Sequence, residues 1–126
     1  MSVAKIFLTL STALLAAAVA AGAFGAHALR ARLAPELLAV YQTAVQYHFY
    51  HALGLALIGV LAMHWPDSGM VRAAGWSMVL GVILFSGSLY LLSLTGMRML
   101  GAITPLGGVA FIAAWMLLGL AVWRNG

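Results

Sequence analysis

The sequence predicts an all-α membrane protein built as a bundle of four transmembrane helices. Three observations support this fold class: the chain is 65% hydrophobic, only 6% of its 126 residues are charged, and its mean hydropathy is +1.09. Soluble globular domains are about half apolar and about a quarter charged. Because six basic and two acidic residues cannot cover the surface of a water-soluble fold, lipid is the solvent that suits this chain.

Four long apolar runs justify the four helices. They cover residues 6–26, 43–63, 73–94 and 102–123. Each run is close to the roughly 20 residues that a helix rising 1.5 Å per residue needs to cross about 30 Å of hydrocarbon. None of them alternates with a period of two, which favours helices over the strands of a barrel. We therefore expect a single transmembrane domain over residues 1–126.

The breaks between the runs contain residues that end or start helices. The segment 64–69 contains proline, aspartate and glycine and is expected to be a turn. Gly96 is expected to follow the third helix as the residue that terminates it. Thr104 and Pro105 are expected to be the N-cap and the first helical position of the fourth helix.

The segment between the first and second runs carries a different pattern. Pro35 suits the first turn of a helix, and Glu36 beside it suits the positive end of the helix dipole. Leu33, Leu37 and Tyr41 fall at helical spacing. We therefore expect a short interfacial amphipathic stretch between helices one and two. It either lies on the membrane surface or extends the second helix above it.

Small residues are expected to pack the helices closely. Ala18, Gly22 and Ala26 are spaced by four residues and form a small face on the first helix. Between helices in lipid, such faces and interhelical hydrogen bonds replace the hydrophobic effect. The run of small residues from Ala16 to Ala23 also permits contacts with a second copy. A homo-oligomer or a membrane-protein partner is therefore an open expectation beside membrane lipid.

The charged residues are expected to anchor the chain at the membrane interfaces. They are scattered near the ends of the apolar runs, which is typical of such anchors and not of a nucleic-acid surface. With four spans, three basic residues fall on each side, so the positive-inside rule does not choose an orientation. Because short hairpins usually insert this way, we expect both termini in the cytoplasm. The basic residues are Lys5, Arg72 and Arg124 on one side and Arg30, Arg32 and Arg98 on the other.

The most unusual polar stretch runs from Tyr41 to His51. On a helix, His48 and His51 share a face with Tyr47, whereas the glutamines of this stretch lie on another face. Lipid cannot satisfy polar groups on both faces, so at least one face is expected to contact protein, water or a ligand. The candidate ligand-binding residues are His27, Gln42, Gln46, Tyr47, His48 and His51.

Three of these residues form a candidate metal or cofactor site. His48 and His51 are spaced by three residues, and His27 reaches a similar depth if the first two helices form a hairpin. Three imidazoles suit zinc or copper, and the same groups suit contact with haem or a quinone. The alternative reading is that these side chains bond carbonyls of the bundle and lipid headgroups, and no cofactor is identified by the sequence.

Several classes of protein lack their characteristic residues in this sequence. Glu36 and Asp67 lie outside the apolar runs, so the intramembrane carboxylate of a proton-coupled exporter is missing. The sequence has no G-x-S-x-G motif, phosphate loop or dinucleotide fingerprint, and it has no cysteine. We therefore expect a non-enzymatic accessory, assembly or lipid-interacting bundle. A small oligomeric transporter or pore is a further alternative.

Four blocks of sequence occur in order along the chain. They are Gly22–His27, Thr43–His48 with Tyr50–Leu53, Phe85–Tyr90 and Leu100–Gly108. Together they resemble the YgdD family of small bacterial inner-membrane proteins over nearly the whole chain. The resemblance implies a four-span protein of the bacterial inner (plasma) membrane. It implies no activity, because that family is a domain-of-unknown-function family.

Overall fold

A computed structural model describes all residues from Met1 to Gly126, and it contains helices and no strands. Four helical spans are long and apolar enough to cross a membrane: Val3–Leu29, Pro35–His64, Gly69–Thr95 and Arg98–Asn125. This confirms the predicted fold class. The elements are α1 (Val3–Phe24), η1 (Gly25–Leu29), α2 (Pro35–His64), α3 (Gly69–Gly81), η2 (Val82–Ser86), α4 (Gly87–Thr95), η3 (Arg98–Ala102) and α5 (Thr104–Asn125).

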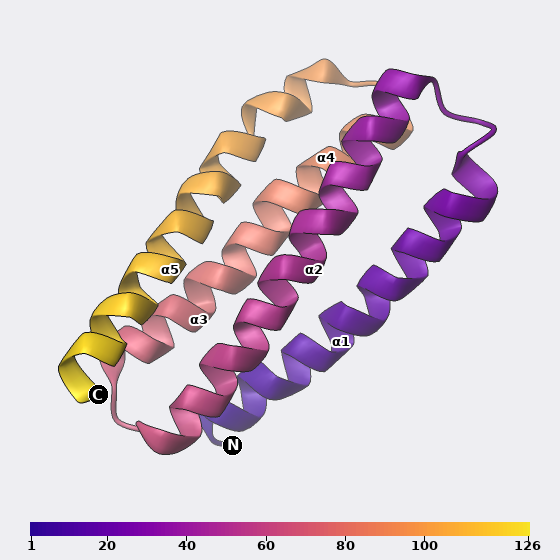
Figure 1. Ribbon diagram of the computed structural model, residues 1–126. Helices are drawn as coiled ribbons and strands as arrows, with labels where there is room; N and C mark the ends of the chain where they lie inside the picture. The colour runs from indigo at the N-terminus through magenta and orange to yellow at the C-terminus, as the bar shows by residue number, and fades with distance from the viewer.

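The spans run alternately up and down, so both termini lie at the same end of the bundle (Figure 1). We call this the termini end, and the opposite end, which carries the connections at 30–34 and 96–103, the loop end. Helix α1 packs mainly against α2, α2 also contacts α3 and α4, and α5 packs against α3 and η2. Helix α2 is therefore central, and it is the most buried of the four spans.

Helix α2 begins at Pro35, so the amphipathic stretch 35–42 is its first two turns and not a separate element on the membrane surface. Proline suits this position because its missing N–H would have no helical partner there. Of the two arrangements that the sequence allowed, the structure shows the extension of the second helix.

The ends of the third and fourth spans test two local predictions. Gly96 has a left-handed backbone (φ 73°), and its N–H donates to the Leu92 carbonyl at 2.7 Å, which confirms it as the terminating residue of α4. The expectation that Thr104 is an N-cap is wrong by one residue. Thr104 is the first residue of α5, Ile103 is the cap residue, and no side chain caps the helix.

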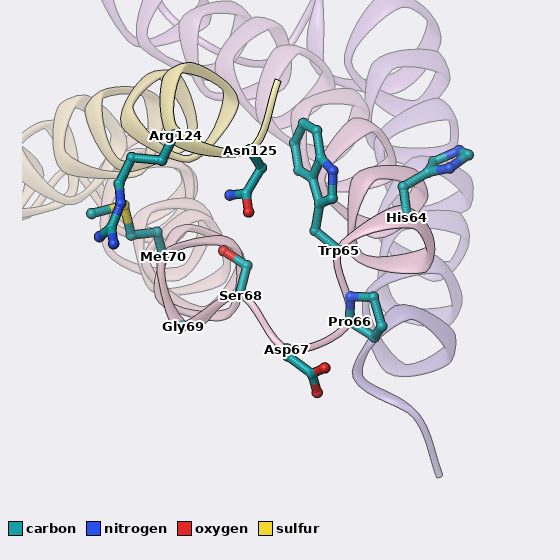
Figure 2. Close-up of a pocket in the computed structure, with 9 residues that line it drawn as sticks. All are labelled: His64, Trp65, Pro66, Asp67, Ser68, Gly69, Met70, Arg124 and Asn125. Atoms are coloured by element: carbon teal, nitrogen blue, oxygen red, sulfur yellow. The ribbon is translucent and has the colours of Figure 1, made fainter.

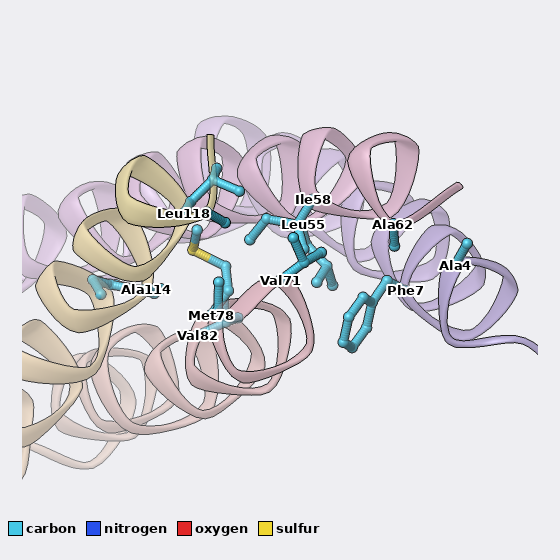
Figure 3. Packing of buried hydrophobic residues seen from close by; sticks show 13 residues of the cluster. Ala4, Phe7, Leu55, Ile58, Ala62, Val71, Met78, Val82, Ala114 and Leu118 are labelled. Carbon is cyan, nitrogen blue, oxygen red and sulfur yellow. The ribbon is translucent and has the colours of Figure 1, made fainter. Parts of the chain in front are cut away.

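A cluster of thirteen buried apolar residues fills the bundle between its middle and the termini end (Figure 3). Phe7, Leu55, Ile58 and Met78 are fully buried in it. The ring of Phe7 lies directly against Gly75, where an added Cβ would come within 2.2 Å of the ring. The packing of α1 on α3 therefore depends on the smallness of one residue.

The outer surface of the bundle is covered by large apolar side chains. Leu57, Ile83, Val109, Ile112 and Met116 are all strongly exposed, although they come from three different spans. Contact of these apolar side chains with water is unfavourable, whereas contact with the hydrocarbon chains of lipids is not. The outer surface thus agrees with a multi-pass membrane protein.

Candidate functional site

Two hydrogen bonds between α1 and α2 fix the depth of the polar stretch on α2. Ser11 Oγ donates to the Ala52 carbonyl at 2.8 Å, and Tyr41 OH donates to the Ala21 carbonyl at 2.5 Å. Halfway between these two anchors, Ala16 of α1 lies level with Gln46 and Tyr47 of α2. Ala16 is also the midpoint of the first apolar run, 6–26. The polar stretch therefore lies level with the middle of the first apolar run.

His48 points into the bundle and is 5% exposed. Its Nδ1 lies 2.8 Å from Tyr90 OH, and the two atoms share a hydrogen bond between α2 and α4. The Tyr90 ring also packs edge-on against Tyr41, with ring centroids 5.3 Å apart. Because Tyr41 bonds α1, the three side chains connect three helices. His48 Nε2 is buried and has no partner at hydrogen-bonding geometry, with the Leu14 backbone of α1 nearby.

His51 points in another direction and is 6% exposed. Its Nδ1–H donates to the Tyr47 carbonyl at 2.8 Å, one turn earlier in the same helix. The imidazole stacks on Phe111 of α5, with centroids 3.5 Å apart and planes 11° apart. Tyr47 stacks on Phe85 of η2 at 4.5 Å. His51 and Tyr47 thus belong to an aromatic layer between α2, η2 and α5.

Further hydroxyl groups connect helices near these residues. Ser86 Oγ donates to the Ala44 carbonyl at 2.8 Å, and Ser88 Oγ shares a hydrogen bond with Thr104 Oγ1 at 2.7 Å. Ser77 Oγ donates to the Ala110 carbonyl at 2.7 Å. Each bond joins two different spans, so these interior hydroxyls act as structural ties.

Gln42 and Gln46 lie on the outside of the bundle, in a groove of about 550 Å³ between α1–η1 and α2. Both side chains are exposed. The side-chain hydrogen bonds of α2 come from Tyr41, Thr43, His48 and His51, and neither glutamine takes part. The groove is lined by Gly22, Gly25, Ala26, Ala39, Tyr41, Gln42, Thr43, Val45 and Gln46.

The structure does not bring the three predicted metal ligands together. His27 is exposed in η1, whereas His48 and His51 are buried and face different helices. No group of three or more His, Cys, Asp or Glu side chains is arranged to hold a metal ion. Of the six candidate residues, His27 lies exposed in η1, the other two histidines are buried, the two glutamines line the outer groove, and Tyr47 is partly exposed beside Phe85.

Sequence reasoning included Tyr41 in the polar stretch but missed Tyr90 as a member of the buried polar group. Tyr90 is 42 residues from its partner His48, so no local spacing connects them. One signal was available, because Tyr90 is the tyrosine that interrupts the third apolar run, 73–94. A hydroxyl inside such a run needs a partner, since lipid offers none.

A second hollow, of about 640 Å³, lies at the termini end where α2 turns into α3. Figure 2 shows Arg124 and Asn125 of α5 across this hollow from Trp65 and His64. Ser68 caps α3, because its Oγ accepts the Val71 N–H at 3.3 Å. The hollow combines charged and aromatic groups at one end of the bundle, and such residues serve as anchors at membrane surfaces.

Comparison with known proteins relates the chain to uncharacterised membrane proteins. The family described as "Protein of unknown function (DUF423)" matches residues 21–108. The UPF0382 membrane protein YwdK of Bacillus subtilis is 50% identical over 117 residues, which are 93% of this chain and 95% of that protein. A UPF0382 membrane protein of Staphylococcus haemolyticus is 46% identical over 95% of this chain and 97% of its own. No solved structure matches the chain.

Proposed function

We propose that this chain, which belongs to the DUF423 family, is a non-enzymatic membrane protein that acts by associating with another transmembrane segment. One observation carries the proposal: Gln42 and Gln46 expose unpaired amides in a groove beside the first apolar run, and Gln46 lies level with the middle of that run. An amide left unsatisfied in lipid costs several kcal/mol. A partner that hydrogen-bonds these amides removes that cost, so association is the favoured state of this surface.

The buried polar groups support the same proposal because they serve packing. Ser11, Tyr41 and Ser86 each donate to a carbonyl of another helix, and His48 bonds Tyr90. These are the interhelical contacts that hold a bundle together in lipid. The Gln42 and Gln46 amides are among the polar groups that take no part in this network.

The alternatives that the sequence allowed find less support. A metal, haem or quinone site would use His27, His48 and His51 together, but His27 is exposed in η1 and the two buried histidines face different helices. A transporter or pore would carry its polar groups along a passage, whereas here they join helix to helix. An absorption spectrum and elemental analysis of the purified protein separate the cofactor alternative from association.

We also propose that the protein resides in the bacterial inner (plasma) membrane with both termini in the cytoplasm. The resemblance to the YgdD family supports the membrane, and the shared end of the two termini restricts the orientation to two choices. A fluorescent protein fused after Gly126 tests the orientation, because it folds in the cytoplasm and fails when exported unfolded. We expect a fluorescent fusion, and a dark fusion whose alkaline-phosphatase counterpart is active would reverse the orientation.

Purification of the full chain in mild detergent tests the association itself. We expect the wild-type protein to elute with a stoichiometric transmembrane partner or as a homo-oligomer. The double variant Gln42→Leu, Gln46→Leu should lose that species, because leucine is satisfied by lipid. The matched control is Leu53→Ala on the same helix, which changes an exposed apolar residue and should leave the species intact. A wild-type protein that elutes as a clean monomer would overturn the proposal.

A further inference from the structure

The outer groove combines two polar groups, of which Gln46 lies deeper in the bundle than Gln42. Gln46 lies level with the midpoint of the first span, as the Ser11 and Tyr41 hydrogen bonds establish. Gln42 lies one turn nearer the loop end, about 6 Å higher at 1.5 Å per residue. Lipid esters and headgroups lie at the membrane interface, so acyl chains surround Gln46 in the free protein, and they cannot hydrogen-bond it.

The wall opposite the glutamines is made of small residues. Gly25 has no room for a side chain, because an added Cβ would lie 2.5 Å from the Tyr41 ring. At Gly22 the same Cβ would meet nothing nearer than Val45 at 3.5 Å, which is an ordinary contact. Gly22 and Gly25 therefore both face α2, and the small residues of this wall leave room in the groove for a neighbouring helix.

The chemistry of the amides selects the partner. A primary amide both donates and accepts hydrogen bonds, so an identical amide is its complement. Two copies in one membrane hold Gln46 at the same depth, and a two-fold axis along the membrane normal brings the two amides together. We propose that a second copy of this chain docks in the groove, with the Gln42 and Gln46 amides of the two copies hydrogen-bonded to each other. This inference rests on the proposed association and names its partner.

The absence of cysteine in the sequence makes the proposal testable by single-cysteine crosslinking in native membranes. Ala39→Cys places a thiol in the groove, and Ile112→Cys places one on α5, where the side chain is 66% exposed outside the groove. Oxidant or a short bis-maleimide should convert Ala39→Cys into a covalent dimer, because crosslinking requires the two positions to be close. Ile112→Cys should stay monomeric under the same conditions.

The role of the amides is tested in the Ala39→Cys background. Adding Gln42→Leu and Gln46→Leu should lower the yield of dimer at least tenfold, while Gln46→Asn, which keeps an amide, should restore most of the yield lost in Gln46→Leu. Unchanged thermal unfolding of the variants in detergent shows that the bundle itself is intact. A dimer whose yield does not change when both amides are removed overturns the inference.

The same experiment separates the inference from the proposed function. If Ala39→Cys crosslinks to a different protein, and this adduct disappears with the amides, the second copy is the wrong partner but association through the groove stands. If Ala39→Cys gives no protein adduct and a photoactivatable lipid labels the groove instead, both the second copy and the association function fail.

Discussion

The two halves of the bundle are held together by different chemistry. In the half nearer the termini, thirteen apolar side chains form one cluster around Phe7, Leu55 and Met78. In the half nearer the loops, Tyr41, His48 and the hydroxyl groups of η2 and α4 join the helices by hydrogen bonds. Helix α2 passes through both halves, so one helix shows both ways of holding a membrane protein together.

The difference shows what each half needs from its sequence. Lipid is as apolar as the cluster, so burying Phe7 in a membrane gains little from the hydrophobic effect and depends on a close fit. A hydrogen bond between helices needs a close approach of backbones before any donor can reach a carbonyl. Both halves therefore rely on small residues, although they use them for different ends: Gly75 accommodates the ring of Phe7, and Gly107 lets α5 approach Phe85.

The largest expected effect comes from Gly107→Ala in the loop half. An added Cβ would lie 2.3 Å from the backbone nitrogen of Phe85, and a backbone cannot move aside as a side chain can. We expect the free energy of unfolding to fall by about 3 kcal/mol, at the upper end of overpacking effects. Titration of the detergent-solubilised protein with SDS, followed by tryptophan fluorescence, measures the change.

The matched control for Gly107→Ala is Gly119→Ala on the same helix, where a Cβ would meet nothing within 4 Å. It should leave the stability unchanged or raise it by up to about 1 kcal/mol, because alanine favours a helix. Equal losses in the two variants would mean that the hydrogen bonds of the loop half do not depend on the approach of α5.

The next largest effect is expected from Phe7→Ala in the termini half. Removing the fully buried ring leaves a cavity of roughly 100 Å³, which costs about 2–3 kcal/mol at about 24 cal/mol per Å³. The transfer part of the usual penalty is absent, because the unfolded side chain returns to lipid. Phe24→Ala, at a ring that is 52% exposed, should cost less than about 0.5 kcal/mol in the same titration. A loss below 1 kcal/mol for Phe7→Ala would show that close packing does not stabilise the half of the bundle nearer the termini.

Tyr90→Phe tests the hydrogen bonds of the loop half directly. Without the hydroxyl, His48 loses its Nδ1 partner, and its Nε2 has none already, so the buried imidazole would have no side-chain partner. We expect a loss of about 1–2 kcal/mol. The double variant Tyr90→Phe, His48→Leu should be more stable than the sum of the two single effects predicts, because no polar group is then left unpaired. If the two losses are additive, the hydrogen bond between His48 and Tyr90 does not contribute to the stability of the bundle.

The helices could be predicted from the sequence because apolar runs and the breaks between them are local features. Gly96 was predicted as the end of a helix, and it lies there with the left-handed backbone that glycine permits. The start of α5 was displaced by one residue because the hydroxyl of Thr104 bonds Ser88 on α4 and not its own helix. That partner is a tertiary feature, which capping statistics do not contain.

For the candidate site, the sequence predicted which segment is polar but not how its side chains are arranged in space. The stretch from Tyr41 to His51 is unusual in composition, so its polarity was visible. Which neighbour each side chain meets depends on how α2 is rotated against three other helices, and no sequence spacing encodes that rotation. His48 consequently meets Tyr90, His51 meets Phe111, and the expected contact of both with His27 does not form.

The smallest expected effect comes from Ser11→Ala, which tests where the apolar half of the bundle ends and the hydrogen-bonded half begins. Ser11 lies close to that boundary, and its Oγ donates to the Ala52 carbonyl at 2.8 Å. Ser11→Ala should cost about 0.6 kcal/mol, the average for an interhelical hydrogen bond in a membrane protein, because the released carbonyl keeps its bond within α2. Ser11→Cys keeps the volume and a weak donor, so it should recover part of the loss in the same SDS titration. A cost above 2 kcal/mol would mean that this one bond also sets the register of α1 on α2, and the hydrogen-bonded half would then extend past the middle of the membrane.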